Sequence, residues 1–397
     1  MKKTFYFTLI LTVSLFLNSC GSNSHEDTSN GTQTFSLAEK KFVHNLFLTE
    51  YLWYDDVASN VDYEAYTDPQ SMINALKLDP PDQWSHMVTK QEYEDFATQK
   101  TAGFGFGYTS DFFIYLVRIN APAYQKLFRG DKILEINGEV VNNTIVRQAS
   151  QNHNVSTTFT VLRDGTQVDV TVTPREYNFN VSLGKIVQEG TNKVGYLRFD
   201  SFTESAVAEF ETIFTTFRNQ NIDELVIDLR YNGGGSVATT SALLDNISRT
   251  HAGQRQLYLD WNPNTQNRNS SFAFEDADMQ DGNELNMKRV FFLVTQNSAS
   301  ASEALISALI PYLGAHNVIT IGDNTHGKPV GMGGRVYGEN YYFLINFFVR
   351  NNAGNTTSFN GISSTCSAQD DITRIMGDRD ETMFATALHY ISHNSCL

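Results

Sequence analysis

Residues 225–235 read LVIDLRYNGGG, an apolar run that passes through Asp228 and Arg230 into three consecutive glycines. The apolar residues at 225–229 predict a buried strand, and the glycines predict a loop whose bare backbone N–H groups can approach a ligand closely. Such N–H groups suit an oxyanion hole, because its donors must already point at the charge that develops during acyl transfer. A flexible turn is the other explanation of a glycine run, so this stretch alone does not define a function.

Strand and helix patterns alternate on both sides of this stretch. Buried strands are expected at 193–199, 225–229, 290–295, 318–321 and 341–349, and helices at 205–218, 237–247, 300–313 and 381–391. Alternation of this kind predicts a layered α/β domain, which we place at residues 177–397.

A second stretch, SASASE at 298–303, follows one of these strands and opens an apolar helix. A serine at a helix N-terminus is surrounded by unpaired N–H groups and by the positive end of the helix dipole, and both stabilise an oxyanion. Helix capping is the commoner role of serine before an apolar run. Glu303 then becomes the acidic partner of a capping box with Ser300 rather than a catalytic acid.

A third stretch, GDNTHGKP at 322–329, places Lys328 between a glycine and a proline. A lysine acts as a base only if burial lowers its pKa substantially, and a Ser–Lys pair is a recognised variant of the Ser–His arrangement. His326 is the rival base. No aspartate at a suitable spacing orients it, so we expect a solvated or packing role for His326.

The three stretches, in this order, resemble the carboxyl-terminal processing (tail-specific) serine proteases, in which a DLR-x-N-x-GG loop, an SASASE segment and a GK loop follow one another. The resemblance covers essentially the whole chain after residue 34. It implies an α/β protease core similar to the ClpP/crotonase fold, with a helical N-terminal region and an inserted small β-rich PDZ domain.

The resemblance also implies the roles of individual residues. The nucleophile falls on Ser300, with Ser302 as the second choice and Ser298 as the third, and the general base falls on Lys328. The oxyanion hole would take one N–H from Ser300 or Ala301 and one from Gly233 or Gly234.

Two features depart from the family pattern. The separation of 328 − 300 = 28 positions between nucleophile and base is slightly longer than usual. Many members carry a glutamine four residues after the lysine to orient it, and Met332 stands there instead. A thioether is only a weak hydrogen-bond acceptor, so another group must orient Lys328 or the enzyme is slow.

The region before the core divides into two parts. Residues 35–100 carry a mainly helical apolar pattern, whereas short strands at 112–119, 132–136, 158–162 and 168–172 indicate a β-rich domain at 101–176. GDKILEINGE at 130–139 resembles the PDZ signature, and GFGFG at 103–107 resembles its carboxylate-binding loop. The resemblance therefore assigns peptide binding to Gly103, Phe104, Gly105 and Phe106.

The first residues read as a targeting segment. Two lysines precede an apolar run that is too short to span a bilayer, so residues 1–19 are expected to form a signal peptide. LNSCG at 17–21 resembles a bacterial lipobox, which implies lipidation at Cys20, although an ordinary signal peptide with an incidental cysteine is the alternative. Polar residues 20–34 would be a flexible tether. We expect a lipid-anchored protein of the cell envelope, on the periplasmic face or the cell surface, with the outer membrane favoured.

Charge and cysteine content narrow the functions further. The chain carries 29 Lys and Arg against 44 Asp and Glu, a net charge of −15, so nucleic acid is a poor partner. Beyond Cys20 only Cys366 and Cys396 remain, and an even remainder in an exported protein suggests a disulfide. The nine histidines show no HExxH or comparable spacing, so no metal or cofactor is expected.

Together these features predict a serine endopeptidase that cleaves polypeptides recognised by their free C-terminal tails. A catalytically weak or silent peptide- or ligand-binding lipoprotein on the same fold is the main alternative, and Met332 favours it. A hydrolase of non-peptide esters or amides is a third reading, and it would need a deep closed pocket. The sequence specifies neither the oligomeric state nor whether the PDZ domain gates the site.

Overall fold

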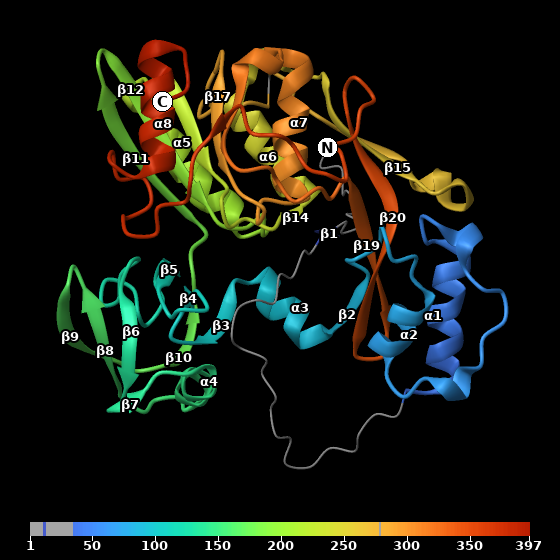
Figure 1. The fold of residues 1–397 in the computed structure, drawn as a ribbon. Helices are drawn as coiled ribbons and strands as arrows, with labels where there is room; N and C mark the ends of the chain where they lie inside the picture. The colour runs from blue at the N-terminus through green and yellow to red at the C-terminus, as the bar shows by residue number, and fades with distance from the viewer. Residues whose placement is uncertain (1–10, 13–34, 278) are drawn as a thin grey trace.

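The computed structural model describes residues 11–12, 35–277 and 279–397. It contains a six-stranded sheet, whose strands β11, β12 and β17 are labelled in the upper part of Figure 1. The strand order is β11-β12-β13-β17-β18-β21, with only β11 antiparallel to its neighbour. The strands are β11 (Ser182–Glu189), β12 (Asn192–Phe199), β13 (Glu224–Asp228), β17 (Val290–Val294), β18 (Val318–Gly322) and β21 (Cys366–Ser367).

Helices cover both faces of this sheet. On one face, α5 (Ala206–Gln220), α6 (Val237–Ile247) and α7 (Ala301–Leu313) share a buried apolar cluster with Leu225 and Ile227 of β13. On the other face, α8 (Thr382–His393) packs over Val226, the residue between them. Successive strand residues point to opposite faces, so an almost wholly apolar strand is what a sheet covered on both sides requires. The predicted layered α/β core is confirmed.

A second, five-stranded antiparallel sheet stands beside the core. It has the order β16-β15-β20-β19, and β2 pairs with the far end of β20. Its strands are β15 (Arg255–Trp261), β16 (Ser270–Ala273), β19 (Val330–Tyr337), β20 (Asn340–Asn351) and β2 (His86–Thr89).

The N-terminal helices pack on this second sheet. Val43 and Phe47 of α1 (Leu37–Thr49) and Met72 of α2 (Pro69–Leu76) share a buried cluster with Met332 of β19. After β2, helix α3 (Lys90–Ala97) leads out of the region. The helical expectation for this region is therefore wrong at β2, which places residues 86–89 in the second sheet.

Residues 100–178 form a small β-rich domain with its own apolar cluster, which lies below the core in Figure 1. Strands β3 (Lys100–Gly103) and β10 (Arg175–Asn178) pair where the chain enters and leaves it. Inside lie a β4-β5 pair, a four-stranded β7-β6-β8-β9 sheet and one α-helix. These elements are β4 (Phe106–Tyr108), β5 (Ile114–Val117), β6 (Lys132–Ile136), β7 (Glu139–Val140), α4 (Asn143–Gln151), β8 (Thr157–Arg163) and β9 (Thr166–Val172).

Short elements complete the chain. Strand β1 (Leu11–Thr12) pairs antiparallel with β14 (Gly235–Ser236), which begins at the last of the three consecutive glycines. The 3-10 helices are η1 (Tyr54–Asp56), η2 (Tyr63–Ala65), η3 (Arg249–His251), η4 (Pro263–Arg268) and η5 (Ala315–Asn317). Cys20, the remaining signal-peptide residues and the tether lie outside the described residues. Within the described ranges, no helix has the length and apolar character needed to cross a membrane.

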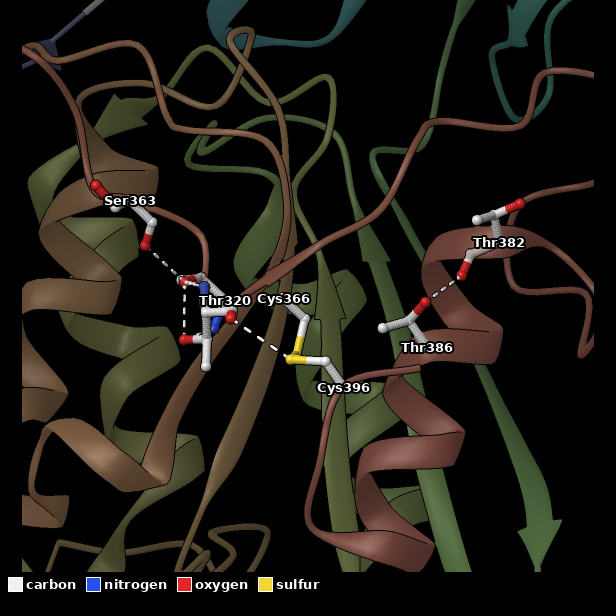
Figure 2. Close-up of a disulfide and its surroundings, with 7 residues drawn as sticks. Thr320, Ser363, Cys366, Thr382, Thr386 and Cys396 are labelled. Carbon is white, nitrogen blue, oxygen red and sulfur yellow. Dashed lines mark hydrogen bonds between the residues drawn. A yellow bond between two sulfur atoms is a disulfide. The ribbon is translucent and has the colours of Figure 1, made fainter.

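A disulfide joins Cys366 of β21 to Cys396 at the end of the chain, as predicted from the cysteine content (Figure 2). Its two Cα atoms are 5.5 Å apart and the bridge spans 30 positions. Beside it, Thr320 of β18 donates from Oγ1 to the Ser363 carbonyl at 3.0 Å. The segment after α8 is thus attached covalently to the edge of the central sheet.

Candidate active site

Ser300 lies where β17 ends and α7 begins, in an unusual backbone conformation. Its φ of 57° and ψ of −109° are rare for a residue with a Cβ. Conformations of this kind persist only where the surroundings enforce them, and they occur preferentially at functional sites. The residue is only 6% exposed.

The two neighbouring serines are already engaged. Ser298 donates from Oγ to the Leu229 carbonyl at 2.7 Å, and Ser302 donates from Oγ to the Asn232 carbonyl at 2.9 Å. These bonds attach the start of α7 to the loop after β13. The geometry therefore favours Ser300 as the reactive hydroxyl of the three.

Lys328 lies on the loop between β18 and β19 and is 2% exposed. Burial lowers its pKa from the ordinary value near 10.5 to about 7, although the carboxylates of Asp82 and Glu303 act in the opposite direction. A substantial fraction of this lysine is therefore neutral at physiological pH, which is the state a general base requires.

Ser300 and Lys328 line the same small cavity, which has a volume of about 10 Å³. The cavity contains no residue of the glycine loop; its other walls come from α7, β15, β20 and two loop residues. Residues 28 positions apart in the sequence are thus brought to one site.

Glu303 connects these two segments. Its carboxylate is fully buried, and Oε2 accepts from the backbone N–H groups of Ser300 and Lys328, each at 2.8 Å. Oε1 accepts from Thr325 Oγ1 at 2.6 Å and from the Gly327 N–H at 2.7 Å. The capping-box interpretation of Glu303 is incomplete, because the same carboxylate also positions the lysine loop.

The glycine loop approaches Ser300 closely. A Cβ at Gly234 would lie 2.9 Å from the Cβ of Ser300, so only glycine fits there. The Gly234 N–H donates to Asn232 Oδ1 at 2.9 Å, so this predicted oxyanion donor is engaged in a hydrogen bond within the loop in this structure. The Ser300 N–H is likewise engaged by Glu303.

Two predicted donors remain. Among the described residues, the N–H groups of Gly233 and Ala301 have no hydrogen-bond acceptor. Ala301 is the first residue of α7, where an unpaired N–H and the helix dipole coincide. Of the four N–H groups considered, those of Gly233 and Ala301 are therefore the two available to bind an oxyanion.

The N-terminal region contributes residues that the sequence analysis missed. The Trp84 ring centroid lies 5.7 Å from Lys328 Nζ, and Trp84 Nε1 donates to His326 Nε2 at 3.3 Å. Asp82 is fully buried and accepts from Tyr51 Oη at 2.8 Å and from Ser85 Oγ at 2.5 Å. Residues 82–85 carry no recognisable motif, and the pairing of β2 with β20 is what brings them to Lys328. His326 packs against Trp84, in line with its expected packing role.

A buried ion network surrounds Arg230, which precedes the glycine loop. Arg230 is fully buried and bonds to Asp228 at 2.9 Å, Glu381 at 2.9 Å and Asp370 at 2.6 Å. Arg129, which belongs to the small β-rich domain, also bonds to Asp370. Although burial opposes it, the two guanidinium groups lower the pKa of Asp370.

Arg129 also contacts the segment that leads into the glycine loop. Its Nη1 donates to Tyr231 Oη at 2.7 Å, and Tyr231 is two residues before Gly233. The small domain therefore contacts the chain immediately before the candidate oxyanion donor.

The predicted peptide-binding loop lies at the entrance to that domain, far in sequence from Ser300. Phe104 is buried against Phe159, with ring centroids 4.8 Å apart, so its side chain is part of the apolar core of the small β-rich domain. The Gly105 carbonyl accepts from the Arg118 N–H at 2.8 Å, and Phe106 begins β4. In the described part of the chain β4 pairs only with β5, which leaves its other edge for a further strand. Gly103 ends β3, and a Cβ there would lie 2.4 Å from Ser150 Oγ of α4.

No group of three or more His, Cys, Asp or Glu side chains within the described ranges has the arrangement of a metal site.

Comparison with known proteins identifies the family. The model of Peptidase family S41 matches residues 193–365, and that of the Peptidase S41 N-terminal domain matches residues 38–86. The chain belongs to peptidase family S41.

Curated relatives are carboxyl-terminal processing enzymes. Carboxyl-terminal-processing peptidase 3, chloroplastic, from Arabidopsis thaliana is 25% identical over 294 residues, which cover 66% of this chain and 52% of the relative. The carboxyl-terminal-processing protease of a Picosynechococcus strain is 28% identical over 204 residues, covering 50% and 46%. The chain spans about half the length of these relatives.

Solved structures share the fold. An S41-assigned protein from Bacteroides fragilis NCTC 9343 superposes with a TM-score of 0.78 at 22% identity, over 89% of this chain and 97% of that chain. The photosystem II D1 C-terminal processing protease gives 0.53 at 16% identity, over 88% and 97%. At these identities the likeness establishes the fold alone.

Proposed function

We propose that this protein is a serine endopeptidase that uses a Ser300–Lys328 dyad on a core of the ClpP/crotonase type. The observation that carries the proposal is the shared cavity: a serine in a rare backbone conformation and a buried lysine with a pKa of about 7 line it together. Family membership and the names of the curated relatives point to the same reaction.

In the first step, neutral Lys328 accepts the proton of Ser300 Oγ, which attacks the carbonyl carbon of a peptide bond. The N–H groups of Gly233 and Ala301 hold the tetrahedral oxyanion. The Lys328 ammonium then donates its proton to the departing amine. In the second step, Lys328 takes a proton from water, the hydroxide attacks the acyl-enzyme, and the acid product leaves as Ser300 regains its proton.

The substrate in this proposal is a polypeptide with a free, loosely structured C-terminus. The small domain would act as a PDZ domain, with the tail added as a strand along the open edge of β4 and its carboxylate at the Gly103–Phe106 loop. The pairing of β1 with β14 supports the extended substrate conformation, because it places two extended residues on a backbone edge next to Gly234.

We also propose that the protein is attached to a membrane of the cell envelope through a lipid on Cys20. The support is the sequence alone: an apolar run, the LNSCG motif at 17–21 and the polar segment that follows. Labelling of wild type but not Cys20→Ser with a radioactive fatty acid would test the anchor.

A binding protein without catalytic activity is the second candidate, and Met332 is the feature that favours it. Met332 is buried in the cluster formed with the N-terminal helices. Trp84 and Asp82 stand near Lys328 instead, so the missing glutamine does not leave the lysine without neighbours.

Cleavage of unfolded casein separates the two candidates. Wild type should cleave it and Ser300→Ala should not, while Ser302→Ala, which loses only a bond to the Asn232 carbonyl, should keep measurable activity. Activity in Ser300→Ala with loss in Ser302→Ala would show that the nucleophile is Ser302 and not Ser300. No cleavage by properly folded wild type would favour the binding protein.

A further inference from the structure

An aromatic surface leads from Lys328 to the solvent. The Trp84 ring centroid lies 5.7 Å from Lys328 Nζ, and Trp84 is partly buried. The ring of Phe359 stacks on that of Trp84, with centroids 6.3 Å apart and planes inclined by 19°, and Phe359 is 42% exposed. Single exposed apolar side chains are common and need no functional explanation. Phe359 differs from them because it continues a ring surface that begins at the proposed general base.

The segment that carries Phe359 is attached to the lysine loop. The Ile362 N–H donates to Thr325 Oγ1 at 2.7 Å, and the Thr325 N–H donates to the Ile362 carbonyl at 3.0 Å. Thr325 Oγ1 in turn donates to Glu303, the carboxylate that positions the lysine loop. A Cβ at Gly327 would lie 2.2 Å from the Phe359 carbonyl oxygen, so the two segments are in close backbone contact. The backbone that carries this ring is therefore in place before a substrate arrives, which lowers the entropic cost of binding.

The surface has a definite place in the proposed reaction. Lys328 donates its proton to the departing amine, so the nitrogen of that amine must come within hydrogen-bond reach of Lys328 Nζ. This nitrogen belongs to the first residue after the scissile bond, and the side chain of that residue begins two bonds away from it. A large side chain there extends over a distance comparable to the 5.7 Å between Nζ and the Trp84 ring. The rings of Trp84 and Phe359 thus lie on the leaving-group side of the scissile bond.

We infer that Trp84 and Phe359 form a subsite for an aromatic or large apolar side chain on the residue immediately after the scissile bond. The inference rests on the proposed function. Such a side chain would remove apolar surface of both rings from water, and an aromatic one would add the attraction between rings. Trp84 Nε1, the polar atom of this surface, already donates to His326 at 3.3 Å. An uncharged polar side chain would therefore lose water against the rings without gaining that hydrogen bond.

The size of the effect follows from the contact of one ring with two others. An aromatic contact strengthens an interaction by about 2–13-fold beyond the burial of apolar area. We therefore expect kcat/KM to be about 10-fold higher with phenylalanine than with alanine at this position, with leucine in between.

Phe359→Ala removes the exposed part of the surface and should lower the ratio of the phenylalanine rate to the alanine rate at least about 3-fold. Phe359→Tyr keeps the ring and should retain the ratio. Leu37→Ala, which truncates a side chain that is 49% exposed on α1, is the control and should also retain it. A general loss of activity cancels in this ratio, because both peptides are measured with the same variant. Thermal melting checks that each variant is folded.

Cleavage is measured with internally quenched, C-terminally amidated peptides built around one bond that the wild type cuts in casein. They carry Gly, Ala, Ser, Leu or Phe after that bond, and mass spectrometry of the products checks that the same bond is cut. Preference for phenylalanine and leucine that falls in Phe359→Ala supports the inference. Equal rates for the phenylalanine and alanine peptides, or an unchanged ratio in Phe359→Ala, would overturn it.

A binding measurement separates a failure of this inference from a failure of the proposed dyad. Amidated alanine-glycine peptides with a single Phe, Leu, Ala or Ser are titrated by fluorescence anisotropy into Ser300→Ala and into Ser300→Ala/Phe359→Ala. If the wild type cleaves nothing, tighter binding of the phenylalanine peptide that depends on Phe359 still supports the subsite. Equal binding of all four peptides, or equal affinities for the two variants, would overturn the subsite in that case.

Discussion

At the scale of single residues, the central feature is a lysine whose pKa is lowered by burial. Burial is the largest influence, and the charges of Asp82 and Glu303 partly oppose it. The lysine is active in the proposed mechanism only when neutral. The rate should therefore be lost as the pH falls below the pKa and should reach a plateau above it.

The pH dependence of kcat/KM should thus show an acidic limb with a midpoint of about 7. Removing the charge of Asp82 removes an influence that raises the pKa of Lys328, so Asp82→Asn should move the limb to lower pH. The exposed Asp55→Asn is the matched control and should leave it in place. An unchanged midpoint in Asp82→Asn would contradict this assignment of the limb.

Glu303 should matter for both activity and stability. Glutamine keeps one oxygen, but its NH₂ group cannot accept the hydrogen bonds that one carboxylate oxygen now receives from Ser300 and Lys328 or from Thr325 and Gly327. Leaving buried donors unsatisfied costs about 1–3 kcal/mol in the free energy of unfolding.

Urea denaturation should show this loss in Glu303→Gln, together with a marked fall in casein cleavage. Glu339→Gln, which alters a carboxylate that is 71% exposed, should change neither. A fully active and stable Glu303→Gln would mean that the four hydrogen bonds do not position the dyad.

At the scale of elements, the sequence predicted the core strands and helices well and the second sheet poorly. Helix α6 (Val237–Ile247) and strand β6 (Lys132–Ile136) lie at the predicted residues, because each has clear apolar periodicity. Strand β19 reads VGMGGRVY, and three glycines in eight residues give it no strand preference of its own. It is held by pairing with β20, a long-range contact that no local pattern reveals.

The same reasoning explains which site residues were found. Ser300 and Lys328 lie in short stretches of sequence that indicate their chemistry without knowledge of the tertiary structure. Trp84 reaches Lys328 only because β2 pairs with β20 across more than 250 positions, from His86 to Phe343. Contacts that depend on such pairing require the tertiary structure.

The contact between the small domain and the glycine loop yields a further prediction. Arg129 bonds to Asp370 and Tyr231, so Arg129→Ala should loosen the small domain and lower the peptidase rate. Faster hydrogen exchange of the backbone at 100–178 would report the loosening. Arg147→Ala, on the exposed side of α4, is the control. Wild-type exchange and activity in Arg129→Ala would show that Arg129 does not couple the two domains.

At the scale of the whole molecule, the N-terminal region, the small domain and the core all reach the candidate site. The first supplies Trp84 near Lys328, and the second supplies Arg129 beside Tyr231. A site assembled in this way requires the folded molecule as a whole, and the disulfide adds to the stability of that fold.

The Cys366–Cys396 bridge closes a loop of 30 positions, which should stabilise the protein by about 3–4 kcal/mol through restriction of the unfolded chain. Cys366→Ser/Cys396→Ser should unfold at lower urea concentration by that amount and should keep its peptidase activity in the absence of denaturant. Addition of reductant to the wild type should have the same effect. Equal stability with and without the bridge would mean that α8 is held by packing alone.

The central claim is that Ser300 and Lys328 act as one catalytic unit, and a double-mutant cycle tests it most directly. Initial rates on unfolded casein above pH 8 are measured for wild type, Ser300→Ala, Lys328→Ala and the double variant, with Lys328→Arg as a control that keeps the charge but cannot deprotonate. Residues of one catalytic unit are strongly non-additive. We predict that each single change abolishes cleavage and that the double change is no worse than either. Substantial cleavage by Lys328→Ala, or losses that multiply in the double variant, would contradict the dyad.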